Sequence, residues 1–143
     1  MEINERILPY VERLESEWET HGKIIIGVDY DDTISPWKMN GFDFERVIKT
    51  LKIAKETGAY IVIFTACSSD RDNEILAYCA SKGLEIDRIN ENPIDLQYGN
   101  TKKIYANIFI DDRAGILESL DILELAMYRI RGKKASNYND SWK

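Results

Sequence analysis

Two groups of aspartates follow apolar runs of the sequence, and their spacing is the feature that most suggests chemistry. Asp29, Asp31 and Asp32 stand within four residues after the first run, and Asp111 with Asp112 follows a later one. Carboxylates a few ångströms apart repel each other, and each raises the pKa of its neighbour. A hard divalent cation such as Mg²⁺ prefers oxygen ligands and would remove that repulsion. Asp29, Asp31, Asp111 and Asp112 are therefore candidate Mg²⁺ ligands.

A hydroxyl and two ammonium groups accompany the carboxylates. Thr65 closes an apolar run, and Lys102 with Lys103 precedes the last one. Such groups can hold phosphoryl oxygens and offset the charge of an anionic substrate. Two carboxylates two residues apart can divide nucleophilic attack from proton transfer. Asp29, at the end of a strand, is the better placed nucleophile, and Asp31, in the following loop, is the better placed general acid and base.

The elements that must position these residues can be predicted from hydrophobic periodicity. Short β-branched apolar runs predict buried strands. Apolar residues that recur every three or four positions predict amphipathic helices. The strands are expected at 23–29, 59–65, 84–89 and 106–110, and the helices at 2–20, 43–57, 70–82, near 101–105 and at about 115–130. Pro9 either starts the first helix or kinks it.

Strands that alternate with helices predict a mainly parallel, doubly wound sheet in a three-layer α/β/α sandwich. In such sheets, ligands bind outside the carboxyl ends of the strands, which is where the candidate residues fall. The 143 residues suffice for one domain. We expect residues 1–130 to form a single catalytic domain and residues 131–143 to form a polar, mobile tail.

Composition and charge exclude several classes of function. The net charge of −6 argues against broad binding to nucleic acid. The sequence has no apolar run long enough to span a membrane and no secretory leader at its start, so a cytoplasmic protein is expected. One histidine and two cysteines cannot furnish a typical four-ligand zinc site.

The order of the motifs resembles that of the haloacid dehalogenase superfamily of hydrolases. The segment from Asp29 to Ile34 resembles the first motif of this superfamily, Thr65 the second, the paired lysines the third, and Asp111 with Asp112 the fourth. The resemblance runs from about residue 23 to residue 113. Blocks around the later motifs look like those of small bacterial and phage members without a cap domain. The resemblance implies the same sandwich fold and no cap.

The resemblance also implies Mg²⁺-dependent phosphoryl transfer through an aspartyl-phosphate. Asp29 would be the nucleophile and a metal ligand. Asp31 would be the general acid and base, and it would offer its backbone carbonyl to the metal. Asp111 would be a further ligand, with Asp112 supporting the metal directly or through water.

Other positions of the resemblance concern the anion. Thr65 would bind phosphate, and Lys103, or else Lys102, would stabilise the nucleophile and the transferred group. Relatives usually have glycine where this chain has Asp32, which we interpret as a solvated surface acid. Relatives often place an arginine soon after the threonine; here the first one is Arg71, so an anion contact is missing or moved.

The predicted function is that of a Mg²⁺-dependent phosphomonoester hydrolase. Its substrate is a nucleotide, a phosphosugar or a nucleic-acid end, the last being disfavoured by the net negative charge. The alternative is a non-catalytic metal- and phosphate-binding module of the same fold. Trp37, in a short flap over residues 35–41, either stacks on a base or sugar or packs onto the domain. The sequence leaves open whether the protein forms a homo-oligomer.

Overall fold

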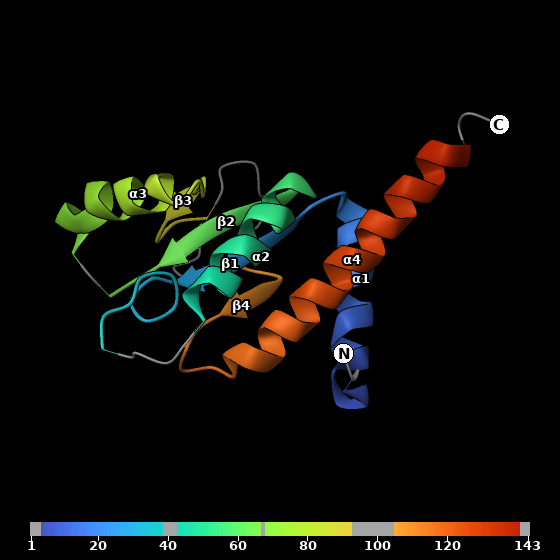
Figure 1. The fold of residues 1–143 in the computed structure, drawn as a ribbon, viewed down its shortest axis with the longest axis horizontal. Coiled ribbons are helices and arrows are strands. Elements are labelled where there is room, and N and C mark those ends of the chain that lie inside the picture. The colour runs from blue at the N-terminus through green and yellow to red at the C-terminus, as the bar shows by residue number, and fades with distance from the viewer. Residues whose placement is uncertain (1–3, 39–42, 67, 93–104, 141–143) are drawn as a thin grey trace.

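In the described residues, helices flank one four-stranded, all-parallel sheet (Figure 1). The computed structural model describes residues 4–38, 43–66, 68–92 and 105–140, without the side chains of 136–140. The strands are β1 (Ile24–Asp29), β2 (Ala59–Phe64), β3 (Arg88–Ile89) and β4 (Ile108–Ile110). The helices are α1 (Leu8–His21), α2 (Phe44–Glu56), α3 (Asp72–Ser81) and α4 (Ile116–Asp140), with 3₁₀ turns at Glu5–Ile7 and Ser69–Arg71. This is the predicted sandwich architecture.

The order of the strands brings the two aspartate groups together. The sheet runs β3-β2-β1-β4, so β1 lies between β2 and β4. Val28 of β1 is level with Ile110 of β4, and Asp29 is level with Phe64 of β2. Because every strand runs in the same direction, all carboxyl ends meet at one edge of the sheet. Segments some eighty residues apart in sequence thus become neighbours there.

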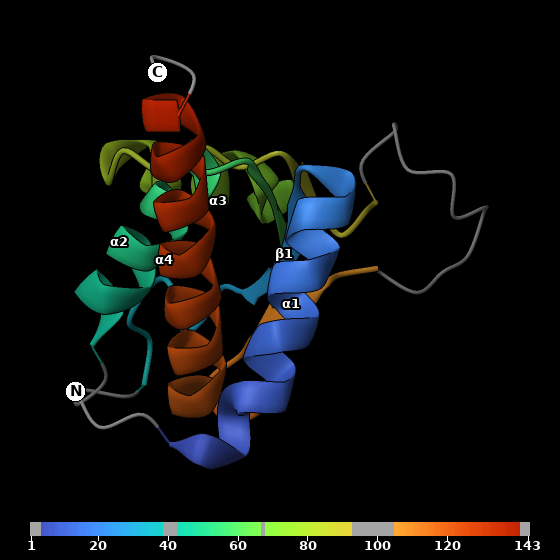
Figure 2. The same ribbon diagram turned by 90° about the vertical axis from the view of Figure 1, so that its right-hand side faces the viewer.

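The core is one cluster of buried apolar side chains from the sheet and the four α-helices. The strands contribute Ile24, Ile26, Val28, Ile61, Ile63 and Ile110, and the helices contribute Val11, Leu14, Trp18, Val47, Leu51, Ile75, Cys79, Leu120, Leu123 and Met127. Figure 2 shows α4 between α2 and α1, and α4 contacts both helices. Each large apolar side chain buried in this way stabilises the fold by about 1.5–3 kcal/mol. The cluster therefore fixes the strand ends relative to one another.

The two edge strands, β3 and β4, are shorter than predicted. Just before each of them, a polar side chain takes the place of a backbone carbonyl as the hydrogen-bond acceptor for the neighbouring strand. The carboxylate of Asp87 accepts the N–H of Ile61 at 2.7 Å, in place of a backbone carbonyl. The amide oxygen of Asn107 accepts the N–H of Ile25 at 2.7 Å in the same way. Lys55 pairs with the Asp87 carboxylate at 2.5 Å. The predictions of strand over 84–89 and 106–110 are therefore wrong at their first residues.

The helix starts follow local chemistry. Pro9 lies in the first turn of α1, where its missing N–H costs nothing, so it starts the helix and does not kink it. α1 ends at His21, which is exposed, and Gly22 follows with a left-handed φ of 73°. The carboxylate of Asp43 caps α2 by accepting the N–H of Arg46 at 2.9 Å. The predicted helix over 70–82 divides into a 3₁₀ turn and α3.

The last helix is longer than predicted. We expected it to end near residue 130, before a mobile polar tail, but α4 continues to Asp140. Residues 131–134 are held by distant partners and carry no apolar periodicity. Lys133 pairs with Glu15 at 2.6 Å and also with Glu19, and Lys134 donates to the carbonyl of Thr57 at 2.8 Å. The helical crossover predicted near 101–105 lies almost wholly outside the described residues.

No described helix combines the length and the apolar character that crossing a bilayer requires.

Candidate active site at the carboxyl edge of the sheet

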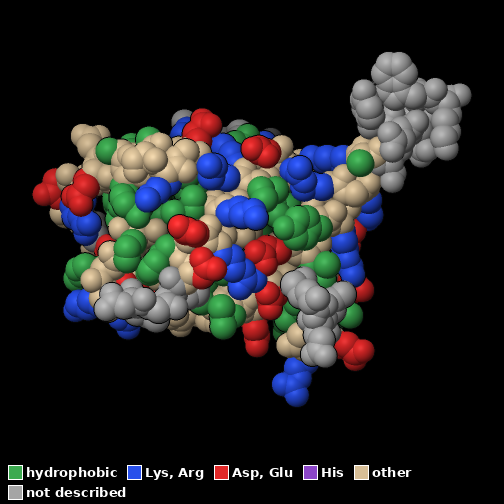
Figure 3. Space-filling view, viewed as in Figure 1, with side chains coloured by type: hydrophobic (Ala, Val, Ile, Leu, Met, Phe, Trp, Pro, Cys, Tyr) green, Lys and Arg blue, Asp and Glu red, His purple; other side chains and the backbone are tan. Residues whose placement is uncertain are grey.

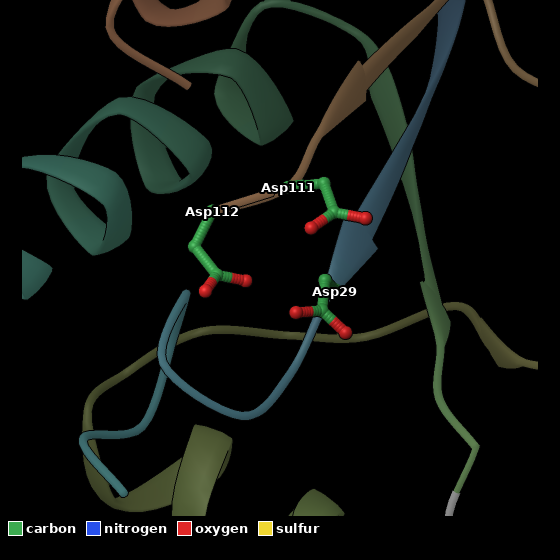
Figure 4. A group of neighbouring side chains, drawn as sticks. All are labelled: Asp29, Asp111 and Asp112. Atoms are coloured by element: carbon green, nitrogen blue, oxygen red, sulfur yellow. The ribbon is translucent and has the colours of Figure 1, made fainter. Parts of the chain in front are cut away.

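Three of the predicted carboxylates converge at the carboxyl ends of β1 and β4. Asp29, Asp111 and Asp112 are half-buried, and one oxygen atom from each lies within 4.8 Å of the others. Figure 4 shows the three side chains arranged around a common space, one at the end of β1 and two just after β4. Asp111 is held in place because its carboxylate accepts the N–H of Arg113 at 2.9 Å. The predicted meeting of the two aspartate groups is therefore present.

Crowding alters the titration of the central carboxyl. The pKa of Asp29 is raised from 3.8 to about 7, first by burial and then by a hydrogen bond with Asp112. The negative charges of Asp111 and Asp112 raise this pKa further. A cation among the three carboxylates would favour the ionised form of each. The donors are all carboxylate oxygens and they share one space, so the cluster fits Mg²⁺.

Thr33 is a member of this cluster that the sequence analysis did not assign. Its side chain is fully buried, and its Oγ1 lies 3.2 Å from Asp29 Oδ2 and 3.2 Å from Asp112 Oδ1. The same oxygen accepts the backbone N–H of Asp112 at 3.1 Å. A hydroxyl has one proton, so it donates to one carboxylate at a time. Its place in the segment that resembles the first motif was the available signal.

Asp31 lies at the same edge but faces a different partner. Its Oδ2 is 3.9 Å from Nη1 of Arg71, whose Nη2 lies 3.4 Å from Glu74. Arg71 ends the 3₁₀ turn that precedes α3, so it reaches the site from beyond β2. The sequence left open whether an anion contact was missing or moved. The guanidinium of Arg71 is a cation beside Asp31, at a later position than the one expected from the resemblance in sequence.

The interpretation of Asp32 as a solvated surface acid is wrong. Its side chain is buried, with 8% of the residue exposed, and its φ is 59°. Its Oδ1 accepts the backbone N–H groups of Trp37 and Lys38, both at 2.8 Å. Aspartate tolerates the left-handed region better than most residues. That φ explains why glycine suits this turn, and the two hydrogen bonds give the carboxylate a role that glycine lacks.

Thr65 comes directly after β2, whereas the predicted strand over 59–65 had it as the last residue. Its backbone is tied to a residue after β3. Its N–H donates to the amide oxygen of Asn90 at 2.8 Å, and its carbonyl accepts from the amide nitrogen at 3.0 Å. Asn90 adopts a left-handed φ of 53°. These contacts fix the loop that carries Thr65. Lys102 and Lys103 lie outside the described residues, so their predicted roles stay predictions.

Comparison with solved structures shows a similar fold. The chain is similar to a conserved protein from Bacteroides thetaiotaomicron, with a TM-score of 0.55 and 25% sequence identity. The match covers 65% of this chain and 78% of that protein. No protein-family profile and no curated protein matches the chain. The likeness concerns the fold, and the chemistry has to be argued from the residues of the site.

Proposed function

We propose that this protein is a Mg²⁺-dependent phosphomonoester hydrolase and a capless member of the haloacid dehalogenase superfamily. The observation that carries the proposal is the convergence of Asp29, Asp111 and Asp112 at the carboxyl edge of a parallel sheet, with the pKa of Asp29 raised to about 7. A structural role does not explain three carboxylates held this close. Bound Mg²⁺ would take the three carboxylates as ligands, and Asp29 would attack the phosphorus of the substrate.

The three carboxylates would hold the cation, together with the carbonyl predicted for Asp31. Bound Mg²⁺ supplies positive charge that shields the nucleophile from the phosphate and neutralises charge developing on the phosphoryl oxygens. The buried hydroxyl of Thr33 orients two of the carboxylates, because Oγ1 lies 3.2 Å from an oxygen of each. This contact would hold the carboxylates of Asp29 and Asp112 in place relative to each other while Asp29 forms and breaks its bond to phosphorus.

Turnover requires two chemical steps. In the first, an oxygen of Asp29 bonds to phosphorus while the bond from phosphorus to the ester oxygen breaks. Asp31 gives its proton to that leaving oxygen, so an alcohol departs and an aspartyl-phosphate remains. In the second, Asp31 takes a proton from water, whose oxygen bonds to phosphorus as the aspartyl bond breaks. Phosphate leaves and Asp29 is restored.

The cation beside Asp31 suits an anionic substrate. Arg71 is 3.9 Å from the Asp31 carboxylate and can bind a phosphoryl oxygen as the substrate arrives. We propose that Thr65 and Lys103, or else Lys102, add further contacts to the phosphate. Figure 3 shows acidic and basic side chains interspersed over one face of the molecule. The net charge of −6 favours a small substrate over a nucleic-acid end. A cytoplasmic location and a homo-oligomer remain predictions.

A panel of phosphomonoesters, assayed with Mg²⁺ and with a chelator, tests the proposal. We expect hydrolysis of at least one ester with Mg²⁺ and its loss with the chelator. Asp29→Asn keeps the shape of the side chain and removes the nucleophile, so the rate should fall by about a thousandfold or more. Glu12→Gln neutralises an exposed carboxylate on α1 and serves as the matched control, with activity unchanged.

The outcomes separate the proposal from its rival. Activity that survives Asp29→Asn would exclude this residue as the nucleophile. Binding of Mg²⁺ with no hydrolysis of any ester would favour the non-catalytic metal- and phosphate-binding module. Calorimetric titration with Mg²⁺ alone measures the binding in both cases.

A further inference from the structure

The indole of Trp37 is exposed to solvent, on the loop that follows Asp29 and Asp31. Trp37 is 66% exposed as a residue, whereas Trp18, in the core, is 1% exposed. The sequence left two interpretations of Trp37, as a residue that packs onto the domain or as one that stacks on a substrate. An exposed fraction this large excludes packing onto the described part of the domain.

The backbone beneath this indole is firmly held. Oδ1 of Asp32 accepts the N–H groups of Trp37 and Lys38 at 2.8 Å each, and Asp32 donates its own N–H to the carbonyl of Ser35 at 2.8 Å. The carbonyl of Tyr30 accepts the N–H of Ser35 at 3.1 Å. Because the buried carboxylate of Asp32 accepts both of these N–H groups, it fixes the backbone from which the indole projects. The loop holds the side chain in place without burying it.

The same hydrogen bonds tie the backbone of Trp37 to the loop that follows Asp29. Ser35 forms a β-bridge with Asp31, the proposed general acid. Trp37 is two residues further on, so its Cα lies within about 7 Å of that of Ser35. The backbone of Trp37 is thus tied to the segment that carries Asp31 and Asp32. We infer that the leaving group of a phosphate bound at Asp29 can reach the indole. The leaving group is the part of the substrate that an open edge must recognise.

A cation completes the surface. Nζ of Lys38 lies 4.5 Å from the centroid of the Trp37 ring, over its face. The ammonium covers one face of the indole, so a planar ligand would stack on the opposite face. A planar ring can stack on an indole, and an ammonium favours an anionic ligand. An aliphatic polyol phosphate would gain only the second of these contacts.

We propose that Trp37 and Lys38 bind the leaving group of the substrate, and that this group contains a planar aromatic ring, as in a nucleoside monophosphate. The inference rests on the proposed function, because it assigns the substrate class of that site. Asp32 is the positioning residue, since it holds both recognition residues by their backbone. Stacking on one ring is expected to change binding by about ten- to hundredfold.

Kinetics with two esters tests the proposal. We would measure kcat and KM for AMP and for glycerol 3-phosphate in the full chain with Mg²⁺. Trp37→Ala should raise KM for AMP about ten- to hundredfold and leave both constants for glycerol 3-phosphate within about twofold. Trp37→Phe should recover most of the loss. Tyr10→Ala is the matched control, because Tyr10 is an exposed aromatic with Arg13 over its ring, on α1.

Equal losses on both esters, or no loss on AMP, would overturn the assignment. A binding measurement separates it from the proposed function. AMP titrated into the Asp29→Asn variant with Mg²⁺ should quench the indole fluorescence, and Trp37→Phe in that background should abolish the quench. Quenching without hydrolysis by the wild type would sustain this site and refute the enzyme. Hydrolysis of glycerol 3-phosphate without quenching by AMP would do the reverse.

Discussion

The raised pKa of Asp29 couples cation binding to the release of a proton. Its carboxyl has an ordinary pKa of 3.8 and one of about 7 in the fold. The folded protein therefore holds a proton between these values that the unfolded chain has lost. In the cation-free protein the contribution of Asp29 to the free energy of unfolding falls as the pH rises through this window, and it is constant above about 7. A cation needs the ionised form and competes with that proton.

The first prediction concerns the affinity for Mg²⁺. With a pKa of about 7, Asp29 is mostly protonated at pH 6 and mostly ionised at pH 8. The dissociation constant should therefore be about tenfold lower at pH 8 than at pH 6, measured by titration calorimetry. The Asp29→Asn variant should bind more weakly and lose this dependence, while Glu118→Gln on α4 should behave as the wild type. Equal affinities of the wild type at both pH values would contradict the prediction.

A second residue-scale prediction concerns the turn at Asp32. Alanine there keeps the left-handed φ of 59° but loses the acceptor of two N–H groups, so Asp32→Ala should destabilise the fold by about 2–4 kcal/mol. Asp32→Gly loses the same hydrogen bonds but relieves the strain, and should be more stable than the alanine variant by about 1 kcal/mol. Urea unfolding measures both. An alanine variant as stable as the glycine variant would show that the strain is unimportant.

At the scale of elements, a polar cluster joins α2 to α4. Nη2 of Arg46 lies 2.6 Å from Glu124 and 2.7 Å from Asp121, and Thr50 donates its hydroxyl to Glu124 at 2.9 Å. The hydrogen bond to Glu124, ahead of the one to Asp121, raises the pKa of Arg46 above its ordinary value. Glu124 is largely shielded from water, so its two partners depend on it. The cluster fixes α4 on α2, and with it the segment of Asp111 and Asp112.

The third prediction follows from this cluster. Glu124→Ala leaves Arg46 and Thr50 without a shared acceptor and should destabilise the fold by about 1–3 kcal/mol in urea unfolding. Glu91→Ala is the control, because Glu91 also faces an arginine, Arg88, at 3.7 Å but is mostly exposed. It should change stability by about 0.5 kcal/mol or less. Similar costs for the two substitutions would show that shielding from water does not matter here.

At the scale of the whole molecule, the far half of α4 ties the chain's end to its beginning. Lys133 pairs with Glu15 of α1, and the hydrogen bond from Lys133 lowers the pKa of Glu15. Arg131 donates to the hydroxyl of Thr57 at 3.1 Å, just after α2. These contacts lie along the second half of α1 and just after α2, which lead into the starts of β1 and β2, at the edge of the sheet opposite the candidate site. Stability and chemistry should therefore be separable.

The fourth prediction tests that separation. A chain that stops after Ile130 should unfold at a Tm about 3–8 °C lower, because it loses the contacts to Glu15 and Thr57. Its affinity for Mg²⁺ at 20 °C should stay within about twofold of the full chain. A chain that lacks only residues 141–143 is the control, with an unchanged Tm. A large loss of Mg²⁺ affinity on the first truncation would mean that α4 shapes the site directly.

The sequence alone determined the architecture and the place of the site. Runs such as 23–29 are too short and too β-branched for helices, and they alternate with amphipathic segments, which dictates a parallel sheet. A parallel sheet gathers its carboxyl ends at one edge, so Asp29 and Asp111 had to lie at the same edge, and the strand order in the structure made them neighbours. Both inferences use information that is local in the chain.

Only the tertiary structure decided which side chains complete the site and where the elements end. Arg71 reaches Asp31, Thr33 joins two carboxylates, and Asp32 turns inward to hold the flap. The length of α4 likewise depends on Glu15 and Thr57, as the starts of β3 and β4 depend on single side-chain acceptors. Each of these features joins a side chain to a partner through a turn or across the fold. Hydrophobic periodicity describes the neighbours of a residue along the chain and gives no information about such distant partners.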